Sequence, residues 1–344
     1  MGNIAKRNLG RTEVALTKLG FGGAPLGDLF ERISETQAGL TLQAAWDAGV
    51  RYFDTAPFYG YGKSEHRFGH FLREQPRKEF VISTKVGRVL RATCNLDSFD
   101  KGMWAGGLPF DVVFDYSYDG IMRSYEDSLQ RLGLNSVDLL LIHDLDHLFH
   151  VNDARITAHM TQLYTSGWRA LDELRSSGQI KGVGAGVNQL GTIPRFLEMV
   201  DLDFFIVAMP YTLLDQDVLD IEFPQCAAHG VGVVIGAVFA SGILATGPKE
   251  NAFYAYAPAP AEVLEKTRRI ETICERYDVP LRAAALQFPL GNPIVAAVIP
   301  GAIKPEHIQS NVEIFERRIP ADLWAELKAE GLLREDAPTP FHLV

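Results

Sequence analysis

Short apolar runs recur along the chain, and each is followed by a segment whose apolar residues return at helical spacing. The runs are 16–22, 51–54, 80–85, 137–143, 180–186, 204–209, 231–236 and 295–300. Runs that are apolar on both faces are typical of parallel strands covered by helices. The intervening helical candidates include 35–49, 121–133, 168–179, 224–230 and 261–277. Eight strand and helix units in series predict an α/β fold, a (β/α)8 TIM barrel, rather than an open doubly wound sheet.

Three segments are longer than a simple alternation of strand and helix requires: 87–117, 241–260 and the tail from about 333. The first two follow predicted strands, so we expect them as long loops at the C-terminal mouth of the barrel. No linker rich in proline or serine interrupts the pattern. We therefore expect residues 1–344 to form a single barrel domain.

Composition narrows the class of protein. The 344 residues are 47% hydrophobic, which is enough for a large core, and the net charge of −10 leaves no basic stripe for nucleic acid. Three cysteines, far apart and odd in number, suit a reducing cytoplasm. The start of the chain lacks an apolar leader, and the run 231–245 is too short to span a bilayer. We expect a cytoplasmic protein without a membrane or nucleic-acid partner.

Four chemically active side chains stand at or just after the ends of predicted strands. Asp54 ends the second strand, Tyr59 lies in the loop beyond it, Lys85 ends the third and His143 ends the fourth. Parallel strands of a barrel end at one mouth, so these groups should converge. An ammonium about 4 Å from a phenolate, at an effective dielectric of roughly 20, would lower the phenol pKa by about three units before the opposing effect of desolvation is subtracted. We expect Lys85 to lower the pKa of Tyr59, Asp54 to hold Lys85, and His143 to donate to the reacting oxygen.

Flanking motifs make the pattern specific. The chain resembles the aldo-keto reductase superfamily in "GFGGAPLG", "FDTAPFYGYGKSE", "STKVG", "LLLIHD" and, at the eighth strand, "VIPGAIKPEHIQSN". The resemblance implies that Asp54, Tyr59, Lys85 and His143 form a catalytic tetrad with Tyr59 as general acid/base. It also implies direct hydride transfer between a nicotinamide cofactor and a carbonyl or alcohol carbon.

The usual dinucleotide fingerprint is absent. Pro25 and Val187 stand where the third glycine of G-x-G-x-x-G would be in the two glycine-rich stretches. This absence fits the resemblance, because aldo-keto reductases bind the cofactor across the barrel mouth.

The resemblance implies cofactor contacts from Gly22, Gly23, Asn188, Tyr211, Phe239, Ser241, Gly242, Leu244, Gly301, Lys304, His307 and Asn311. Tyr211 would stack on the nicotinamide and Asn188 would hold its carboxamide. Gly301 and His307 stand where a lysine and an arginine often bind the 2′-phosphate of NADP, so we expect NAD to be preferred over NADP. Lys304 is the cation that would compensate. The chain also departs from the family in "GVN" after the fifth strand and in Ala208, where glutamine is common.

Further motifs narrow the branch. "FDYSYDGIMRSYEDSLQRLGL", "GAGVNQ", "PYTLLDQ", "FASGILATG" and "LRAAALQFPL" resemble the D-threo-aldose (L-fucose) 1-dehydrogenases and pyridoxal 4-dehydrogenase. Both kinds of substrate are cyclic hemiacetals, and oxidation of the ring C–OH gives a lactone. The sequence leaves aldose and pyridoxal open. A general NADPH-dependent carbonyl reductase and a cofactor-sensing binding protein are the alternatives.

Candidate substrate contacts are Phe58, Trp104 and Asp144. Phe58 and Trp104 belong to an aromatic set, completed by Phe110, Tyr116 and Tyr118, that would either line an apolar pocket or pack its own loop.

The segment "HDLDHLFH" gathers three histidines and two aspartates. We expect no metal there, because the resembling family needs none and loop spacing alone fixes no coordination geometry.

Overall fold

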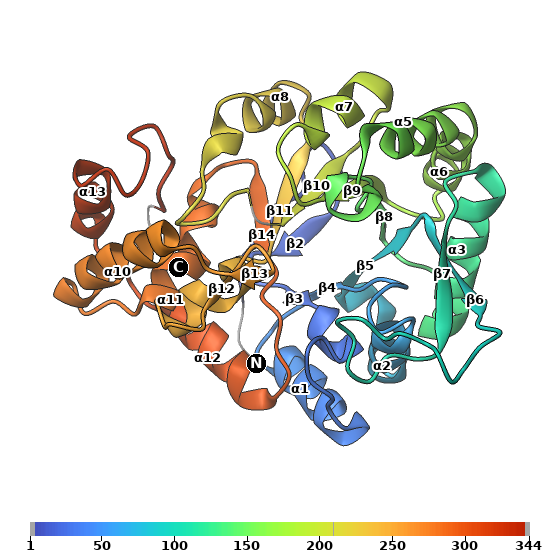
Figure 1. Ribbon diagram of the computed structural model, residues 1–344, viewed down its shortest axis with the longest axis horizontal. Helices are drawn as coiled ribbons and strands as arrows, with labels where there is room; N and C mark the ends of the chain where they lie inside the picture. Colours follow the sequence, from blue (N-terminus) through green and yellow to red (C-terminus); the bar gives the residue numbers. More distant parts are fainter. Residues whose placement is uncertain (1–3, 209, 341–344) are drawn as a thin grey trace.

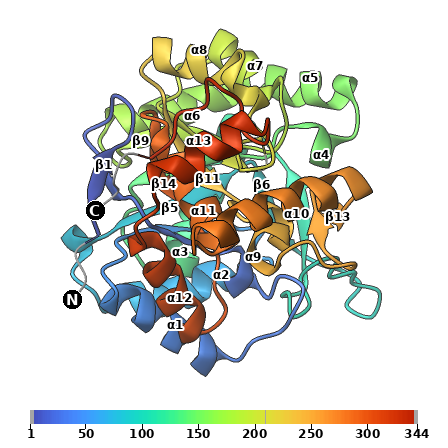
Figure 2. The ribbon, with the colours of Figure 1, turned by 90° about the vertical axis from the view of Figure 1, so that its left-hand side faces the viewer.

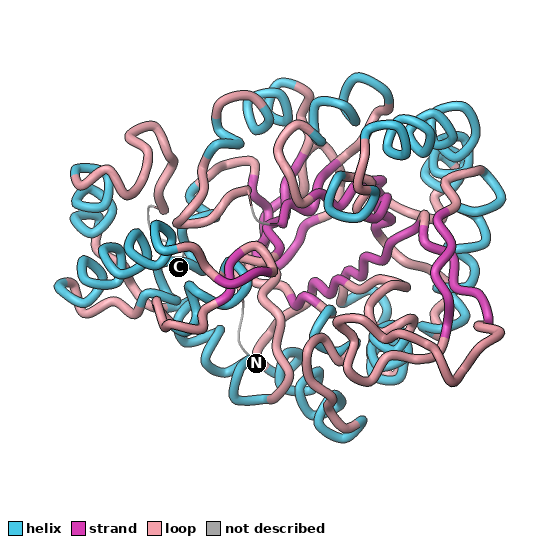
Figure 3. The backbone as a smooth tube through the Cα atoms, in the orientation of Figure 1, coloured by secondary structure: helices cyan, strands magenta, loops and turns pink. Residues whose placement is uncertain are grey.

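A computed structural model describes residues 4–208 and 210–340. Its central sheet has eight parallel strands in the order β14-β11-β10-β9-β8-β5-β4-β3. Their bounds are β3 Phe21–Gly22, β4 Tyr52–Asp54, β5 Val81–Val86, β8 Leu139–His143, β9 Gly182–Val187, β10 Phe204–Ala208, β11 Gly232–Gly236 and β14 Val295–Val298. Each lies within or overlaps one of the eight predicted runs, and the strands curl into a ring (Figure 3).

Two isolated parallel bridges join the ends of the sheet: Leu19 pairs with Val298, and Gly22 pairs with Gly301. A Cβ on Gly22 would lie 2.6 Å from the carbonyl oxygen of Ile299, so only glycine permits this closure. The closed ring confirms the predicted (β/α)8 barrel.

Helices surround the strands (Figure 1): α1 Glu35–Asp47, α2 Lys63–Leu72, α3 Tyr118–Leu132, α4 His147–His150, α5 Asp153–Gln162, α6 Trp168–Ser176, α7 Thr192–Met199, α8 Glu222–Ala228, α9 Ile243–Thr246, α10 Ala261–Arg276, α11 Leu281–Gln287, α12 Pro305–Glu316 and α13 Ala321–Ala329. The five predicted helical segments correspond to α1, α3, α6, α8 and α10. Local signals fix their ends: the Ser117 side chain accepts from Gly120 N at the start of α3, and Gly133 ends it at φ 62°.

A hairpin of β1 Lys6–Asn8 and β2 Ala15–Thr17 precedes the barrel. Leu9 and Leu16 of this hairpin are buried with Tyr52, Leu139 and Phe204, which fill the inside of the barrel. In Figure 2, β1 lies at one end of the molecule, and β6 and β13 lie toward the other. The hairpin therefore closes the end opposite the mouth.

The long segments at the mouth contain hairpins. Within 87–117, β6 Arg88–Ala92 pairs antiparallel with β7 Phe110–Phe114. Within 241–260, β12 Phe253–Tyr254 pairs antiparallel with β13 Ala257–Pro258. The tail, whose last four residues lie outside the described part, passes Gly291 closely enough that a Cβ there would lie 2.5 Å from Thr339. No helix in the described ranges is long and apolar enough to cross a membrane.

Candidate active site

Lys85 connects the groups that the sequence placed at the barrel mouth. Its Nζ donates to Asp54 Oδ2 at 2.7 Å, to the Thr55 carbonyl at 2.9 Å and to the Tyr59 hydroxyl at 3.1 Å. The β4 and β5 ends that carry Asp54 and Lys85 are neighbours in the sheet. The structure thus brings these three side chains together as the strand positions predicted.

The ion pair of Asp54 and Lys85 is buried, with 2% and 3% of the two side chains exposed. Asp54 Oδ1 accepts from Ser83 Oγ at 2.7 Å, and Ser83 lies 3.2 Å from the Tyr52 hydroxyl. Burial raises the pKa of Asp54, although Lys85 and Ser83 both act to lower it. Hydrogen bonds therefore run from inside the barrel through the ion pair to Tyr59.

The acidity of Tyr59 differs from the expectation. Burial raises its pKa well above the usual 10, and the carboxylates of Asp54 and Asp144 raise it further, whereas Arg88 acts to lower it. The pKa of Tyr59 is therefore not brought below its usual value as expected, because burial outweighs the neighbouring ammonium of Lys85. At neutral pH the phenol keeps its proton, so Tyr59 must lose it before it can accept one.

His143 is neutral and directed at a carboxylate. Burial lowers its pKa to about 3, and its Nε2 lies 3.1 Å from Asp144 Oδ2. Because a neutral imidazole has one N–H and a carboxylate only accepts, this N–H is on Nε2. The predicted donation by His143 to the reacting oxygen is therefore not what this geometry shows, since the proton is shared with Asp144. Nδ1 is buried without a hydrogen-bond partner in the described part of the chain.

Asp144 connects His143 with two other groups. Its Oδ2 also accepts from Arg88 Nη2 at 2.9 Å, and its Oδ1 accepts from Asn188 Nδ2 at 3.0 Å. Burial alone would raise the pKa of Asp144, but His143 and Arg88 hold it below its usual range. Asn188 also donates to Asp146, at 3.0 Å, so the residue expected to hold the carboxamide is itself fixed by two carboxylates.

Aromatic rings surround this centre. The Phe58 ring lies 5.3 Å from Trp104 and 6.1 Å from His143, and Trp104 lies 5.7 Å from Tyr59, all between ring centroids. Trp104 is buried, and its Nε1 has no acceptor among the described residues. Phe58 and Trp104 therefore lie beside Tyr59 and His143, and their contact with a substrate stays a prediction.

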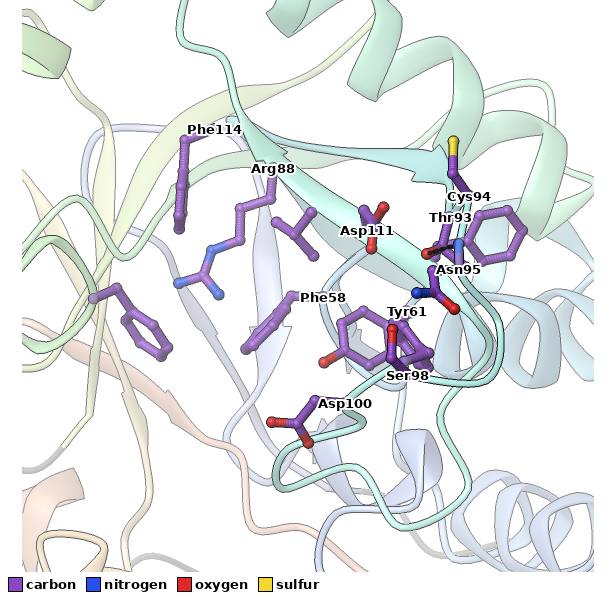
Figure 4. Close-up of a pocket in the computed structure, with 14 residues that line it drawn as sticks. Phe58, Tyr61, Arg88, Thr93, Cys94, Asn95, Ser98, Asp100, Asp111 and Phe114 are labelled. Atoms are coloured by element: carbon purple, nitrogen blue, oxygen red, sulfur yellow. Dashed lines mark hydrogen bonds between the residues drawn. The ribbon is translucent and has the colours of Figure 1, made fainter.

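The other three aromatic candidates lie in different places. Phe110 lines a pocket of about 560 Å³ together with Phe58 (Figure 4). Tyr116 is buried, and its hydroxyl contacts the His143 carbonyl at 3.3 Å, so it supports the site from below. Tyr118 begins α3, and its hydroxyl donates to Glu173 at 2.6 Å.

The hairpin of β12 and β13 adds Tyr256, which the sequence did not single out. The backbone N–H of Tyr256 donates to Ser241 Oγ at 3.0 Å. Tyr256 also acts electrostatically to raise the pKa of Tyr59, which places its hydroxyl near the reacting centre. The only sequence signal was that the segment follows a strand and is unusually long.

Tyr211 and Leu244 do not occupy the expected positions. The Tyr211 ring is fully buried, 4.9 Å from the Phe223 ring and 5.2 Å from the Phe288 ring between centroids, so it is not free to stack on a nicotinamide. Leu244 in α9 is also fully buried in the outer core. In this arrangement neither side chain exposes surface to the barrel mouth, and their contact with a cofactor stays a prediction.

The glycines expected near the cofactor are explained by packing of the barrel itself. A Cβ on Gly23 would lie 2.5 Å from the Asp54 carbonyl oxygen, and one on Gly301 would lie 2.5 Å from Pro25. These positions require glycine whatever binds above them.

The loop after β11 has an unusual backbone. Ala237, Ala240 and Ser241 have φ of 47°, 47° and 58°, and Gly242 has φ of 108°. Left-handed residues turn successive N–H groups toward one side, an arrangement that suits anions.

A cluster of cations lies at the end of the barrel that carries the "VIPGAIKPEHIQSN" motif. Arg282 of α11 donates to Ser310 Oγ at 3.0 Å and to Asn311 Oδ1 at 3.2 Å, and its Nε is buried without a partner among the described residues. Lys304 and Arg282 both act to lower the pKa of His307, so the three are close. The Arg282 guanidinium also lies 5.7 Å from the Phe239 ring centroid. An orphaned donor within a basic cluster fits the phosphates of a dinucleotide.

The histidines of "HDLDHLFH" point in different directions. His147 pairs with Asp153 at 3.2 Å, and the His150 ring lies 4.8 Å from the His159 ring between centroids. Across the described residues, no group of three or more His, Cys, Asp or Glu is placed to hold a metal ion.

Comparisons with known proteins identify the family and agree with the fold. The model of the aldo/keto reductase family matches residues 18–330. Pyridoxal 4-dehydrogenase of Microbacterium luteolum is 47% identical, over 95% of this chain and 98% of its own. D-threo-aldose 1-dehydrogenase of Pseudomonas sp is 40% identical, over 95% and 96%. Among solved structures, the holo form of aldo-keto reductase AKR11C1 from Bacillus halodurans superposes with a TM-score of 0.73 at 25% identity, covering 96% and 97% of the two chains.

Proposed function

Because the chain belongs to the aldo/keto reductase family, we propose that this oxidoreductase oxidises a cyclic hemiacetal to its lactone by direct hydride transfer, with Tyr59 as general acid/base. The observation that carries the proposal is the position of Lys85 Nζ, which donates to both Asp54 and the Tyr59 hydroxyl. The names of the two relatives, both dehydrogenases, support oxidation as the working direction.

In this proposal the hydroxyl proton of the hemiacetal passes to the Tyr59 oxygen as the C–H hydrogen leaves with its electron pair. A carbon–oxygen double bond forms, and the products are the lactone, the reduced cofactor and one proton. The bound oxidised nicotinamide supplies the hydride acceptor and a positive charge. Lys85, 3.1 Å from the phenol oxygen, stabilises the phenolate that Tyr59 must become before it accepts a proton.

Pyridoxal, giving 4-pyridoxolactone, and an aldose such as L-fucose are the two substrates to compare, because the two relatives are named for these classes. The assay follows lactone and NADH formation with pyridoxal, L-fucose, D-arabinose and L-galactose. Reduction of simple aldehydes with NADPH, without oxidation of any hemiacetal, would instead indicate a general carbonyl reductase. Tight cofactor binding without turnover would indicate a cofactor-sensing protein.

We propose NAD as the preferred cofactor, since Gly301 and His307 replace the cations expected at the 2′-phosphate. Arg282 and Lys304 are the cations that would favour NADP. Comparing kcat/KM for the two cofactors tests the preference, and a value about tenfold higher for NADP, a difference of about 1.4 kcal/mol, would overturn it.

Tyr59→Phe tests the role of the phenol. We expect turnover to fall by roughly 10²- to 10⁴-fold, the usual contribution of a general acid or base, with cofactor affinity unchanged. Tyr61→Phe is the matched control, because the Tyr61 hydroxyl donates to the Lys101 carbonyl at 3.3 Å and not to the ion pair. Native turnover in Tyr59→Phe would exclude the phenol as the proton carrier.

A further inference from the structure

Arg88 is a buried cation whose hydrogen-bonding capacity is mostly unused. It begins β6, three residues after Lys85, and is 1% exposed. Its Nη2 donates to Asp144 Oδ2 at 2.9 Å, but Nε and Nη1 are buried without an acceptor among the described residues. The guanidinium carbon lies 4.2 Å from the Phe58 ring centroid and 4.0 Å from that of Phe149. The rings hold the guanidinium in place and leave two donors unsatisfied.

Unsatisfied donors on a buried charge are costly and rare in folded proteins, so they call for a missing acceptor. The position of Arg88 indicates where this acceptor would be. Its charge acts to lower the pKa of both Tyr59 and His143, which places the guanidinium within electrostatic range of the reacting centre. Arg88 also lines the pocket of about 560 Å³, whose walls do not include Tyr59 or His143. Arg88 therefore lies between this pocket and the reacting centre, which it meets through Asp144.

The pocket has two chemically different parts. Near the guanidinium its walls are the rings of Phe58, Phe114 and Phe149. Asp100 and Asp111 also line the pocket; Figure 4 shows Asp100 beyond Phe58 from the guanidinium and Asp111 on the side of Thr93 and Asn95. A flat ring suits the aromatic walls, an anionic oxygen suits Arg88, and a protonated ring nitrogen suits the carboxylates.

We propose that Arg88 binds the substrate through its free N–H groups. These groups donate to an ionised oxygen on the aromatic ring of the substrate. The ring carbon that carries this oxygen is next to the ring carbon to which the reacting hemiacetal carbon is attached. This inference rests on the proposed function and narrows its substrate class. An aromatic hemiacetal with a hydroxyl on the adjacent ring carbon is favoured over a neutral sugar. The contact fixes which face of the hemiacetal carbon is presented to Tyr59. Arg88 thereby selects the substrate, while the tetrad performs the proton transfer.

The test compares pyridoxal with its 3-O-methyl ether, which cannot ionise at that oxygen, in the wild type and in Arg88→Met. We expect the variant to lower kcat/KM for pyridoxal about ten- to hundredfold, the loss of one charge-assisted hydrogen bond, and for the ether less than about threefold. Arg91→Met is the matched control, because Arg91 lies on the same strand with its side chain exposed. Arg88→Lys, which keeps the charge, should recover part of the preference for pyridoxal.

Calorimetric titration of pyridoxal and the ether into the same proteins gives a readout without turnover. If Arg88→Met lost the same binding affinity for pyridoxal and for the ether, Arg88 would serve only to hold Asp144. That result would overturn the inference and leave the proposed function standing. If the wild type oxidises no hemiacetal, the proposed function fails, and equal binding of pyridoxal to wild type and variant would overturn the inference as well. If Arg88→Met does not fold, the wild type alone provides the test. The same kcat/KM and affinity for pyridoxal and for the ether would then overturn the inference.

Discussion

Neutralising Asp54 should destabilise the barrel by a measurable amount, because it leaves a buried ammonium without its counter-ion. Asp54→Asn keeps the shape of the side chain that lies 2.7 Å from Lys85 Nζ. Lys85 would then have only neutral acceptors: the new amide oxygen, the Thr55 carbonyl and the Tyr59 hydroxyl. Removing one partner of a buried pair costs about 3–5 kcal/mol. At about 2.1 cal/mol/K per residue, the entropy of unfolding of 344 residues converts this cost into a Tm lower by roughly 4–7 °C.

Differential scanning calorimetry at pH 7 measures the change directly. The double variant Asp54→Asn/Lys85→Met removes both charges and should recover at least half of the loss, since an apolar pair replaces an ion pair at little cost. Asp278→Asn is the control, because its pair with Arg317 is on the surface and should be worth at most about 1 kcal/mol. If Asp54→Asn melts within about 1 °C of the wild type, or the double variant melts lower still, the reasoning from charge burial is refuted.

Two further predictions concern pH and the cofactor. Burial lowers the pKa of His143 to about 3 and of His150 to about 4. As the pH falls below about 6.5, these histidines therefore take up protons in the unfolded chain before they do so in the folded protein. The free energy of unfolding is highest above this pH and declines as the pH falls. Between pH 7 and pH 5, each histidine should lower the free energy of unfolding, measured with urea, by roughly 2 kcal/mol. His150→Asn should therefore lose roughly 2 kcal/mol less than the wild type over this range. The same pH dependence in the variant and the wild type would contradict the lowered pKa of His150. Arg282→Met should weaken NADP binding about tenfold more than NAD binding in fluorescence titrations, because only NADP carries the additional phosphate; equal weakening would place Arg282 elsewhere.

Most of the barrel followed from the sequence because parallel strands buried on both faces produce apolar runs that helical patterns do not interrupt. The hairpin of β6 and β7 was not predicted as strands. Its two halves, 88–92 and 110–114, are separated by 17 residues rich in turn formers, so no short loop signals the pairing. The 16–22 run was predicted as one strand, but it divides between β2, which closes the bottom, and the two residues of β3.

The candidate site followed from strand ends, and the direction of a side chain is hardest to predict where the chain has left the sheet. Asp54, Lys85 and His143 are the last or next-to-last residues of their strands, so topology alone places them at the mouth. Tyr211 stands three residues beyond the end of β10, where the strand alternation no longer determines direction, and its ring enters the outer core. Arg88 was missed because its role depends on a contact with Asp144, which no local pattern reveals.

Asp144 connects Arg88, the proposed substrate contact, with His143 of the proposed tetrad. Its hydrogen bonds explain how Arg88 could bind a substrate without changing the contacts of His143. One carboxylate, on a residue with φ of 44°, accepts from His143, Arg88 and Asn188. Because His143 is neutral, Asp144 balances the charge of Arg88 alone, just as Asp54 balances Lys85. A substrate oxygen bound at the free N–H groups of Arg88 therefore adds an acceptor without displacing Asp144. The hydrogen bond from the Nε2 proton of His143 to Asp144 likewise stays in place.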